Sequence, residues 1–150
     1  MASEEFLIEM ETFFLALADK TRLRLLNLMR DKEICVCFFT EVLGESQPKI
    51  SRHLAYLRNA RLVEARRDGK WMHYRIIEPE NEVARRVLQS TLDGLKKQED
   101  MQRDYEKLDE ACCEVSVPVT ISRAPKPNTF AQADINQSRE EREELETFLL

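Results

Sequence analysis

The sequence predicts a mainly helical α+β fold, a winged helix-turn-helix with further helices at both ends of the core. Three observations predict it: amphipathic helical segments at the start of the chain, a polar-faced helix after a glycine turn, and a basic β-hairpin directly after that helix. With 150 residues the chain fits one compact domain plus extensions, and its 3 glycines and 5 prolines argue against an all-β fold.

Two helices come first, over residues 4–17 and from residue 20 to Met29 or Arg30. The apolar residues of the first recur at three- and four-residue steps, which is typical of one helix face: Phe6, Met10, Phe13, Phe14 and Leu17. Asp19 is suited to cap the second helix, whose apolar positions include Leu23, Leu26 and Leu28.

A helix-turn-helix follows. Residues 35–43 predict a short third helix that ends at Gly44, and Ser46 then caps a fourth helix with Pro48 in its first turn. The buried face of this fourth helix is formed by Ile50, Leu54 and Leu57. Its other faces carry side chains that can form hydrogen bonds: Gln47, Lys49, Ser51, Arg52, His53 and Tyr56.

Two strands are predicted over residues 62–67 and 71–76, with Asp68-Gly69 as the turn between them. Basic residues gather at the tip of this hairpin, namely Arg66, Arg67 and Lys70. Trp71 and Tyr74 are expected to pack the hairpin against the body. A basic hairpin directly after a helix-turn-helix is a wing.

The periodicity of residues 80–110 predicts one long helix with a broken apolar stripe, which must pack on the first helix or on a partner chain. Polar, aperiodic residues 114–137 predict a flexible tail, and Ser138 with Glu141 predicts a capping box for a short terminal helix. The expected domains are therefore residues 1–110, for DNA binding and dimerisation, and residues 111–150, a Cys-Cys segment with an acidic tail.

The charge is distributed unevenly. Residues 1–18 carry a net charge of −4, residues 19–75 carry +6 and residues 76–150 carry −7. The overall charge of −5 hides a basic middle, and a local basic face is what phosphate binding requires.

No membrane span is expected, because the longest apolar runs, residues 13–18 and 34–39, have only six residues each. The acidic N-terminus does not fit a signal peptide, so we expect a cytoplasmic protein. In that compartment Cys35, Cys37, Cys112 and Cys113 are expected to be thiols or metal ligands.

The chain resembles the ArsR/SmtB family of metalloregulatory repressors, most of all its arsenical-resistance branch. Four stretches, within roughly residues 10–110, carry the resemblance: LADKTRLRLL at 17–26, ICVC at 34–37, SQPKISRHL at 46–54 and DGKWMHYR at 68–75. The resemblance implies a homodimer, joined through its first and last helices, on an imperfect palindrome. It also implies release from DNA when trivalent arsenic or antimony binds cysteine thiolates.

Two positions depart from the family pattern. Thr40 stands where a third cysteine is usual, and a hydroxyl is not a soft ligand. Arg61 stands where a glycine usually ends the recognition helix, so that helix end is expected to differ.

The second helix of the motif is expected to enter the major groove of double-stranded DNA. Gln47 suits adenine, Arg52 suits guanine and Lys49 suits a phosphate. Beside the capping Ser46, the side chains of Ser51, His53 and Tyr56 are expected to reach bases or phosphates, and the wing residues Arg66, Arg67 and Lys70 to hold the backbone.

Cysteine favours thiophilic ions such as trivalent arsenic, antimony, cadmium or zinc. Among these, the resemblance implies arsenite or antimonite as the inducer, with no organic cofactor. Cys35 and Cys37 are the first candidates, and Cys112 and Cys113, where the long helix runs out, are the second. On an ideal helix, residues two apart differ by about 200°, so their sulfurs would point to opposite sides. Ligand binding is therefore expected to unwind the start of the third helix over residues 34–38.

Other interpretations stay open. The same fold serves a redox- or cadmium-responsive repressor. A thiol oxidoreductase has little support, because no cysteine follows a strand at the start of a helix and no phosphate-cradling loop is visible. The acidic C-terminal tail is also a candidate protein-interaction segment.

Overall fold

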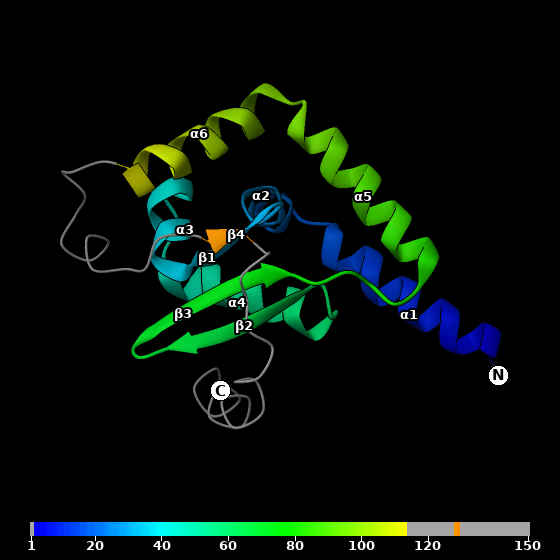
Figure 1. The fold of residues 1–150 in the computed structure, drawn as a ribbon. Helices are drawn as coiled ribbons and strands as arrows, with labels where there is room; N and C mark the ends of the chain where they lie inside the picture. The colour runs from blue at the N-terminus through cyan, green and yellow to red at the C-terminus, as the bar shows by residue number, and fades with distance from the viewer. Residues whose placement is uncertain (1, 114–127, 130–150) are drawn as a thin grey trace.

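The computed structural model describes residues 2–113 and 128–129, where helices cover one face of a small antiparallel sheet (Figure 1). The expected mainly helical winged fold is confirmed. Its helices are α1 (Ala2–Leu17), α2 (Lys20–Leu28), α3 (Val36–Leu43), α4 (Gln47–Asn59), α5 (Glu82–Lys96) and α6 (Glu99–Cys113). Its strands are β1 (Lys32–Cys35), β2 (Val63–Asp68), β3 (Trp71–Ile76) and β4 (Asn128–Thr129).

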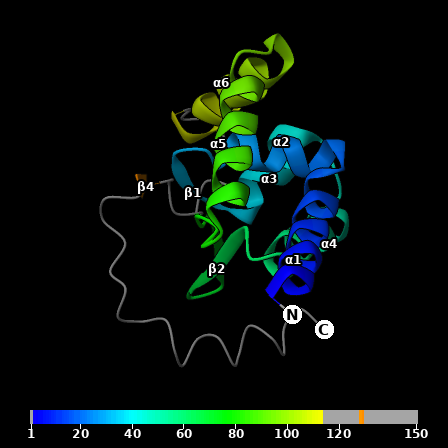
Figure 2. The ribbon, with the colours of Figure 1, turned by 90° about the vertical axis from the view of Figure 1, so that its right-hand side faces the viewer.

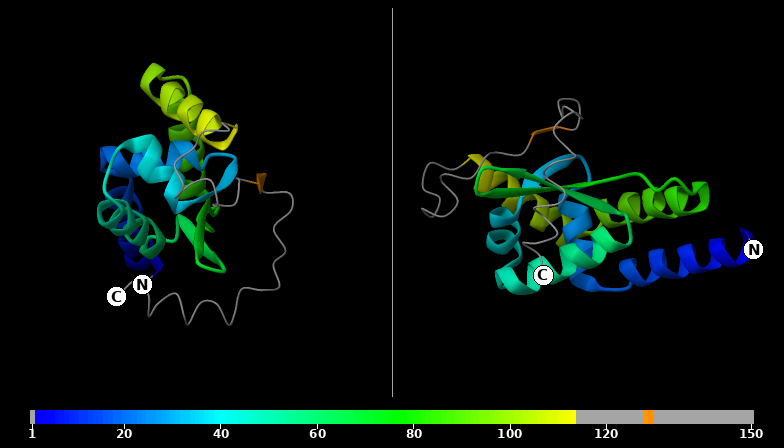
Figure 3. Two further views of the ribbon diagram at one scale, coloured as in Figure 1. Left: turned by 90° about the vertical axis from the view of Figure 1, so that its left-hand side faces the viewer. Right: turned by 90° about the horizontal axis from the view of Figure 1, so that it is seen from below.

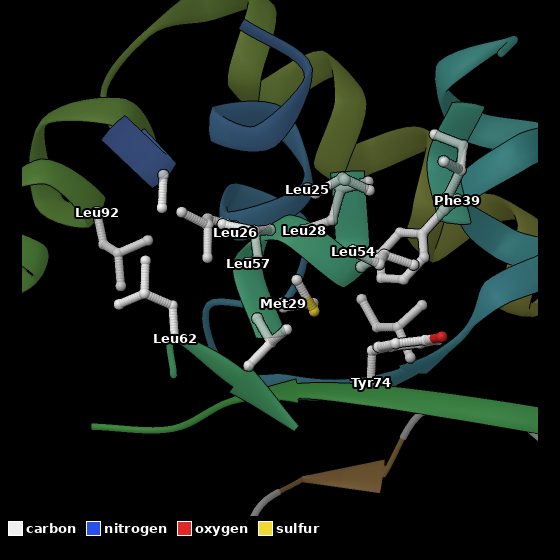
Figure 4. Packing of buried hydrophobic residues seen from close by; sticks show 14 of the residues in the cluster. Leu25, Leu26, Leu28, Met29, Phe39, Leu54, Leu57, Leu62, Tyr74 and Leu92 are labelled. Atoms are coloured by element: carbon white, nitrogen blue, oxygen red, sulfur yellow. The ribbon is translucent and has the colours of Figure 1, made fainter. Parts of the chain in front are cut away.

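The core is centred on α2, which follows α1 after a short turn. Asp19 caps α2 as expected, because its side chain accepts a hydrogen bond from the Arg22 amide at 3.0 Å. Around α2 converge fully buried side chains from other elements, which Figure 4 shows in place: Phe39 of α3, Leu54 and Leu57 of α4, and Tyr74 of β3. This packing fixes the helix-turn-helix against the sheet.

The sheet has the strand order β2-β3-β1-β4, with antiparallel pairs throughout. Strand β1 was not predicted from the sequence, and the expectation of a helix starting at residue 35 was wrong. Cys35 ends β1, pairs with His73 of β3, and also precedes α3 as its N-cap. The expectation that no cysteine follows a strand at the start of a helix was therefore also wrong. The reason is long-range: the edge of β3 offers backbone partners that no local pattern reveals.

The predicted single helix over residues 80–110 is two helices. The chain turns at Lys97 and Gln98, and α6 folds back over α2 and α3 rather than continuing the line of α5 (Figure 2; Figure 3, left). Leu92 of α5 and Leu108 of α6 are both buried. A straight helix would have carried Leu108 away from the core, so the break in the apolar stripe marks a real turn.

The chain just after α4 has a left-handed residue that is not glycine. Arg61 follows the C-cap Ala60 and adopts this conformation, with φ of 57°. The arginine therefore takes the left-handed backbone that the sequence analysis expected a residue other than glycine to disfavour. The tertiary structure holds an arginine in a conformation that glycine adopts more easily.

Two predicted features lie outside the described residues, namely the flexible tail over most of 114–137 and the terminal helix that Ser138 would cap. Within the first of these, Asn128–Thr129 is described, and it pairs with β1 as β4. In the part of the chain that the structure describes, no helix is both long and apolar enough to cross a membrane.

Candidate DNA interface and thiol site

The helix-turn-helix consists of α3, a short turn and α4. Gly44 ends α3 in the left-handed conformation, with φ of 65°, and its amide donates to the Thr40 carbonyl. Ser46 caps α4 through a hydrogen bond from the Lys49 amide, and Pro48 lies in the first turn as predicted. These local signals place α4 with its apolar face buried and its polar faces available.

Three of the predicted DNA-reading side chains of α4 lie on the surface. Gln47 and Arg52 are exposed, and Ser51 is half-buried beside them. The capping Ser46 is at the start of the same helix, while the ammonium group of Lys49 pairs with Glu45 at 2.9 Å. Exposed amide and guanidinium groups on one end of a groove-sized helix suit base edges in a major groove.

His53 and Tyr56, also predicted to reach DNA, lie beside Arg22 of α2. The Nη1 atom of Arg22 is 3.3 Å from Nδ1 of His53, and its guanidinium carbon lies 4.1 Å from the centre of the Tyr56 ring. Burial lowers the pKa of His53, and the neighbouring charges of Arg22, Lys49 and Arg52 lower it further against the opposing charge of Asp19. His53 therefore favours its neutral form more than a free imidazole does.

The wing is the β2–β3 hairpin. Its two loop residues are Gly69 and Lys70, one position later than the predicted Asp68-Gly69 turn, because Asp68 still pairs with Trp71. Gly69 has φ of 60°, which the tight loop requires. The ammonium group of Lys70 lies 5.6 Å from the Trp71 ring, and Arg67 donates to the Gly69 carbonyl at 2.9 Å.

Arg66 pairs with a buried carboxylate, while its own side chain stays partly exposed. Its guanidinium group binds the carboxylate of Glu33, a buried residue of β1 whose role was not predicted. His73, which is buried, lies 3.9 Å from that carboxylate. The network ties the wing to β1, the strand that carries Cys35.

The two thiols of the Cys-X-Cys segment lie at the junction of β1 and α3. Cys35 is fully buried with an extended backbone, while Cys37, in the first turn of α3, is half-buried against the same core. Burial raises the pKa of the Cys35 thiol to about 12, and the neighbouring Cys37 thiol contributes to the rise. Because Cys35 ends β1 and is not helical, the opposite orientation expected of two thiols on an ideal helix does not apply to this pair.

The second cysteine pair ends α6. Cys112 is half-buried and packs against the core, and Cys113 is the last residue of the helix. The backbone there is helical rather than irregular as expected, so adjacent residues differ by about 100° around the axis.

Within residues 2–113 and 128–129, no three side chains of His, Cys, Asp or Glu cluster closely enough to hold one metal ion. Thr40, which occupies the place of a third cysteine, donates its hydroxyl hydrogen to the Cys37 carbonyl at 2.8 Å. Among the described residues, Cys35 and Cys37 are thus two candidate thiol ligands with no third His, Cys, Asp or Glu ligand grouped with them.

Two functional residues were missed by sequence reasoning. Arg22 and Glu33 contact residues that lie 31 and 33 positions away along the chain, His53 and Arg66. No local spacing connects such partners. For Arg22, the nearest signal was its place in a stretch that resembles a known family.

Comparison with known proteins supports the assignment of these elements. Residues 19–65 match the family model described as "Bacterial regulatory protein, arsR family". The "Arsenical resistance operon repressor" of Escherichia coli is 49% identical over 72 residues, 47% of this chain and 61% of that protein. An "Uncharacterized HTH-type transcriptional regulator" of Methanocaldococcus jannaschii is 41% identical over 66 residues, 43% of this chain and 74% of that protein.

The fold comparison agrees. The solution structure of the homodimeric winged helix-turn-helix DNA-binding domain Mb0332 from Mycobacterium bovis has a TM-score of 0.51 at 27% identity, covering 65% of this chain and 88% of that one. The chain spans about half to three fifths of the length of the arsenic-resistance regulators that it matches. These relatives are transcriptional regulators, not enzymes. The chain belongs to the arsR family of bacterial regulatory proteins.

Proposed function

We propose that this protein is a homodimeric transcriptional repressor of the cytoplasm, which binds a palindromic operator and leaves it when trivalent arsenic or antimony binds cysteine thiols. One observation carries the proposal: Cys35 and Cys37 lie at the junction of β1 and α3, and α3 packs directly on α4, whose Gln47 and Arg52 are exposed. The proposed ligand site and the proposed DNA-binding helix α4 therefore belong to the same helix-turn-helix.

DNA binding would use α4 and the wing. Gln47 and Arg52 supply the amide and guanidinium groups that pair with adenine and guanine, and Ser51 lies next to them. Lys49, Arg67 and Lys70 add positive charge for phosphates, which positions the helix without reading sequence. In an arsR-type homodimer, two such helices would read half-sites separated by about one helical turn or a multiple of it.

Dimerisation would use α1 and α5. The outward side of α1 exposes large apolar side chains, which a monomer rarely leaves in water: Phe6, Leu7, Ile8, Phe14 and Leu15. Val83 of α5 is exposed at the same end of the molecule, where α1 and α5 lie near each other (Figure 1; Figure 3, right). A second copy of this chain, with the same face, would cover both.

Cys35 and Cys37 would hold the ligand. Arsenous acid exchanges each hydroxyl group for a thiol sulfur and releases one water molecule, so the thiol proton leaves in that water. A divalent cation, in contrast, displaces the thiol proton into solution, so a high thiol pKa opposes its binding. The high pKa of Cys35 therefore opposes the binding of arsenous acid less than the binding of a divalent cation. A third sulfur would come from the Cys112–Cys113 pair, the second subunit or glutathione.

Binding would disturb the DNA-reading unit. Cys35 has no exposed surface and is paired through β1 with His73, and a close-packed interior leaves no room for an added arsenic atom. The β1–α3 junction must therefore open when Cys35 binds the ligand. Since α3 packs on α4, that movement would change the position of the recognition helix.

The second candidate is a cadmium- or redox-responsive repressor of the same fold. The presence of two thiols at the same β1–α3 junction favours it, because oxidation joins neighbouring sulfurs. The raised pKa of Cys35 disfavours it, because the thiolate is the species that oxidants and cadmium require. Cadmium binding would accordingly weaken steeply as the pH falls, whereas arsenite binding would not.

The test is a fluorescence anisotropy titration on the duplex upstream of the gene, with and without arsenite. The variants are Cys35→Ser/Cys37→Ser and Cys112→Ser/Cys113→Ser, the second of which tells whether the Cys112–Cys113 pair supplies the third sulfur. The proposal expects wild type to bind and be released, and the first variant to bind and stay bound. If the wild-type protein binds the duplex but is not released by arsenite, the assignment of the ligand is wrong. Parallel titrations with cadmium and with an oxidant would then identify the alternative.

A further inference from the structure

Arg22 of α2 connects the helix that we assign to dimerisation with the helix that we assign to DNA reading. On one side, its Nε atom donates to the Ala16 carbonyl at 2.8 Å and its Nη2 atom to the Leu15 carbonyl at 3.0 Å. Both carbonyls belong to the last turn of α1, where backbone oxygens lack helical partners and a positive charge is favoured.

The other side of the same guanidinium group contacts α4. Its Nη1 atom lies 3.3 Å from Nδ1 of His53, and its central carbon lies over the Tyr56 ring, 4.1 Å from the ring centre. Because a guanidinium group only donates hydrogen bonds, Nδ1 must accept and the imidazole must be neutral. Burial and the neighbouring cations hold the pKa of His53 low, which agrees with that assignment.

The geometry of this contact requires an arginine. The guanidinium group is a rigid planar fork, so one edge bound to α1 fixes where the other edge meets α4. An ammonium group at the same place would keep the charge but could not span both helices in one fixed arrangement. Asp19 supports the fork, because it accepts the Arg22 amide at 3.0 Å and lies 3.7 Å from His53.

We infer that Arg22 is a positioning residue that fixes α4 relative to α1, and so sets the spacing of the two DNA half-sites that the homodimer accepts. The inference rests on the proposed function, in which α1 joins the subunits and α4 reads DNA. Each base pair of spacer moves a half-site by about 3.4 Å and rotates it by about 35°. If the link between α1 and α4 is loosened, the dimer should therefore accept a wider range of half-site spacings, while the half-site sequence that α4 recognises stays the same.

The experiment is a selection from a pool of random-sequence duplexes, run in parallel with wild type, Arg22→Lys and the control Lys20→Met. Lys20 is an exposed cation near Arg22 on the same helix, so its replacement reports charge alone. We expect wild type and the control to enrich paired half-sites at one spacing. Arg22→Lys should enrich the same half-site sequence over several spacings, with roughly tenfold weaker binding to the wild-type optimum.

Salt dependence separates positioning from direct contact. Arg22→Met, which removes the charge, should keep the slope of log affinity against log salt, because loss of a side chain that bound a phosphate directly would lower that slope by about 0.9. His53→Ala, which removes the partner from the other helix, should broaden the spacing in the same way and provides an independent test if an Arg22 variant folds poorly.

Three results would overturn the inference. They are an unchanged spacing in folded Arg22→Lys and His53→Ala, an altered half-site sequence in Arg22→Lys, and a reduced salt slope. Each would leave the proposed function intact. A wild-type protein that enriches no duplex would overturn the proposed function, and this inference with it.

Discussion

Arg24 of α2 and Asp104 of α6 form a two-pronged ion pair, with Nε and Nη2 of the arginine 2.7 and 3.0 Å from the two carboxylate oxygens. Asp104 is only 4% exposed. The side-chain hydrogen bond raises the pKa of Arg24. The pair, together with the bond from Asn27 to the Met101 carbonyl, holds the returning helix α6 against the core.

Replacing Asp104 with alanine should destabilise the fold by about 1–3 kcal/mol. A fully buried pair that loses one partner costs about 3–5 kcal/mol, but Arg24 is one-third exposed and regains water. Urea unfolding measures the change. The matched control is Glu82→Ala, which breaks the exposed pair with Arg86 and should change the free energy of unfolding by less than about 0.5 kcal/mol. Equal effects for both variants would contradict this account of α6.

Arg61→Gly should stabilise the protein by about 0.5–1 kcal/mol. The left-handed backbone of Arg61 is unfavourable for a residue with a Cβ atom and readily adopted by glycine. The urea midpoint should rise with an unchanged slope. Arg61→Ala is the control, because it removes the side chain and keeps the strain, so it should not stabilise. A gain in both variants would assign the effect to the arginine side chain instead.

Acidification should weaken the fold through His53. Its folded pKa lies below the ordinary value of about 6.5, so the unfolded chain binds more protons in the window below that value. The free energy of unfolding should therefore fall as the pH drops from about 6.5 through the folded pKa. Buried His73, whose pKa is lowered first by burial and then by Arg66, adds to the same trend.

His53→Asn tests this assignment, because asparagine keeps an acceptor for Arg22 but does not titrate. Urea midpoints at pH 7.5 and 5.5 should differ less in this variant than in wild type. An equal difference would show that His53 does not titrate in this window.

The two kinds of DNA contact should separate in binding assays. Arg52→Ala should weaken the specific duplex by about 1–3 kcal/mol and leave nonspecific binding nearly unchanged, because a base contact carries sequence information. Lys70→Ala should weaken all duplexes alike and lower the salt slope by about 1. If Arg52→Ala instead lowers the affinity for specific and nonspecific duplexes equally, then Arg52 contacts the DNA phosphates and not a base.

Local chemistry accounts for what the sequence made predictable. Asp19, Gly44 and Ser46 each act on backbone groups within four residues, so the helix ends followed from their spacing. The wing followed from two strand patterns and a glycine, although its turn lies one residue later than expected.

Long-range contacts account for the rest. Strand β1 exists because β3 pairs with it, which places Cys35 in a strand and outside helix α3. The Arg22–His53 contact joins residues 31 apart, and the turn at Lys97 depends on the surface that α2 and α3 offer to α6. Residues that are adjacent in the sequence give no signal for any of these contacts.

The most direct test of the central claim is amide hydrogen exchange over residues 32–43, with and without arsenite, in wild type and in Cys35→Ser/Cys37→Ser. The account predicts faster exchange at the β1–α3 junction of wild type on arsenite addition, together with DNA release, and neither change in the variant. Release from DNA with unchanged exchange at this junction would contradict the claim that the buried Cys35 must move to bind the ligand.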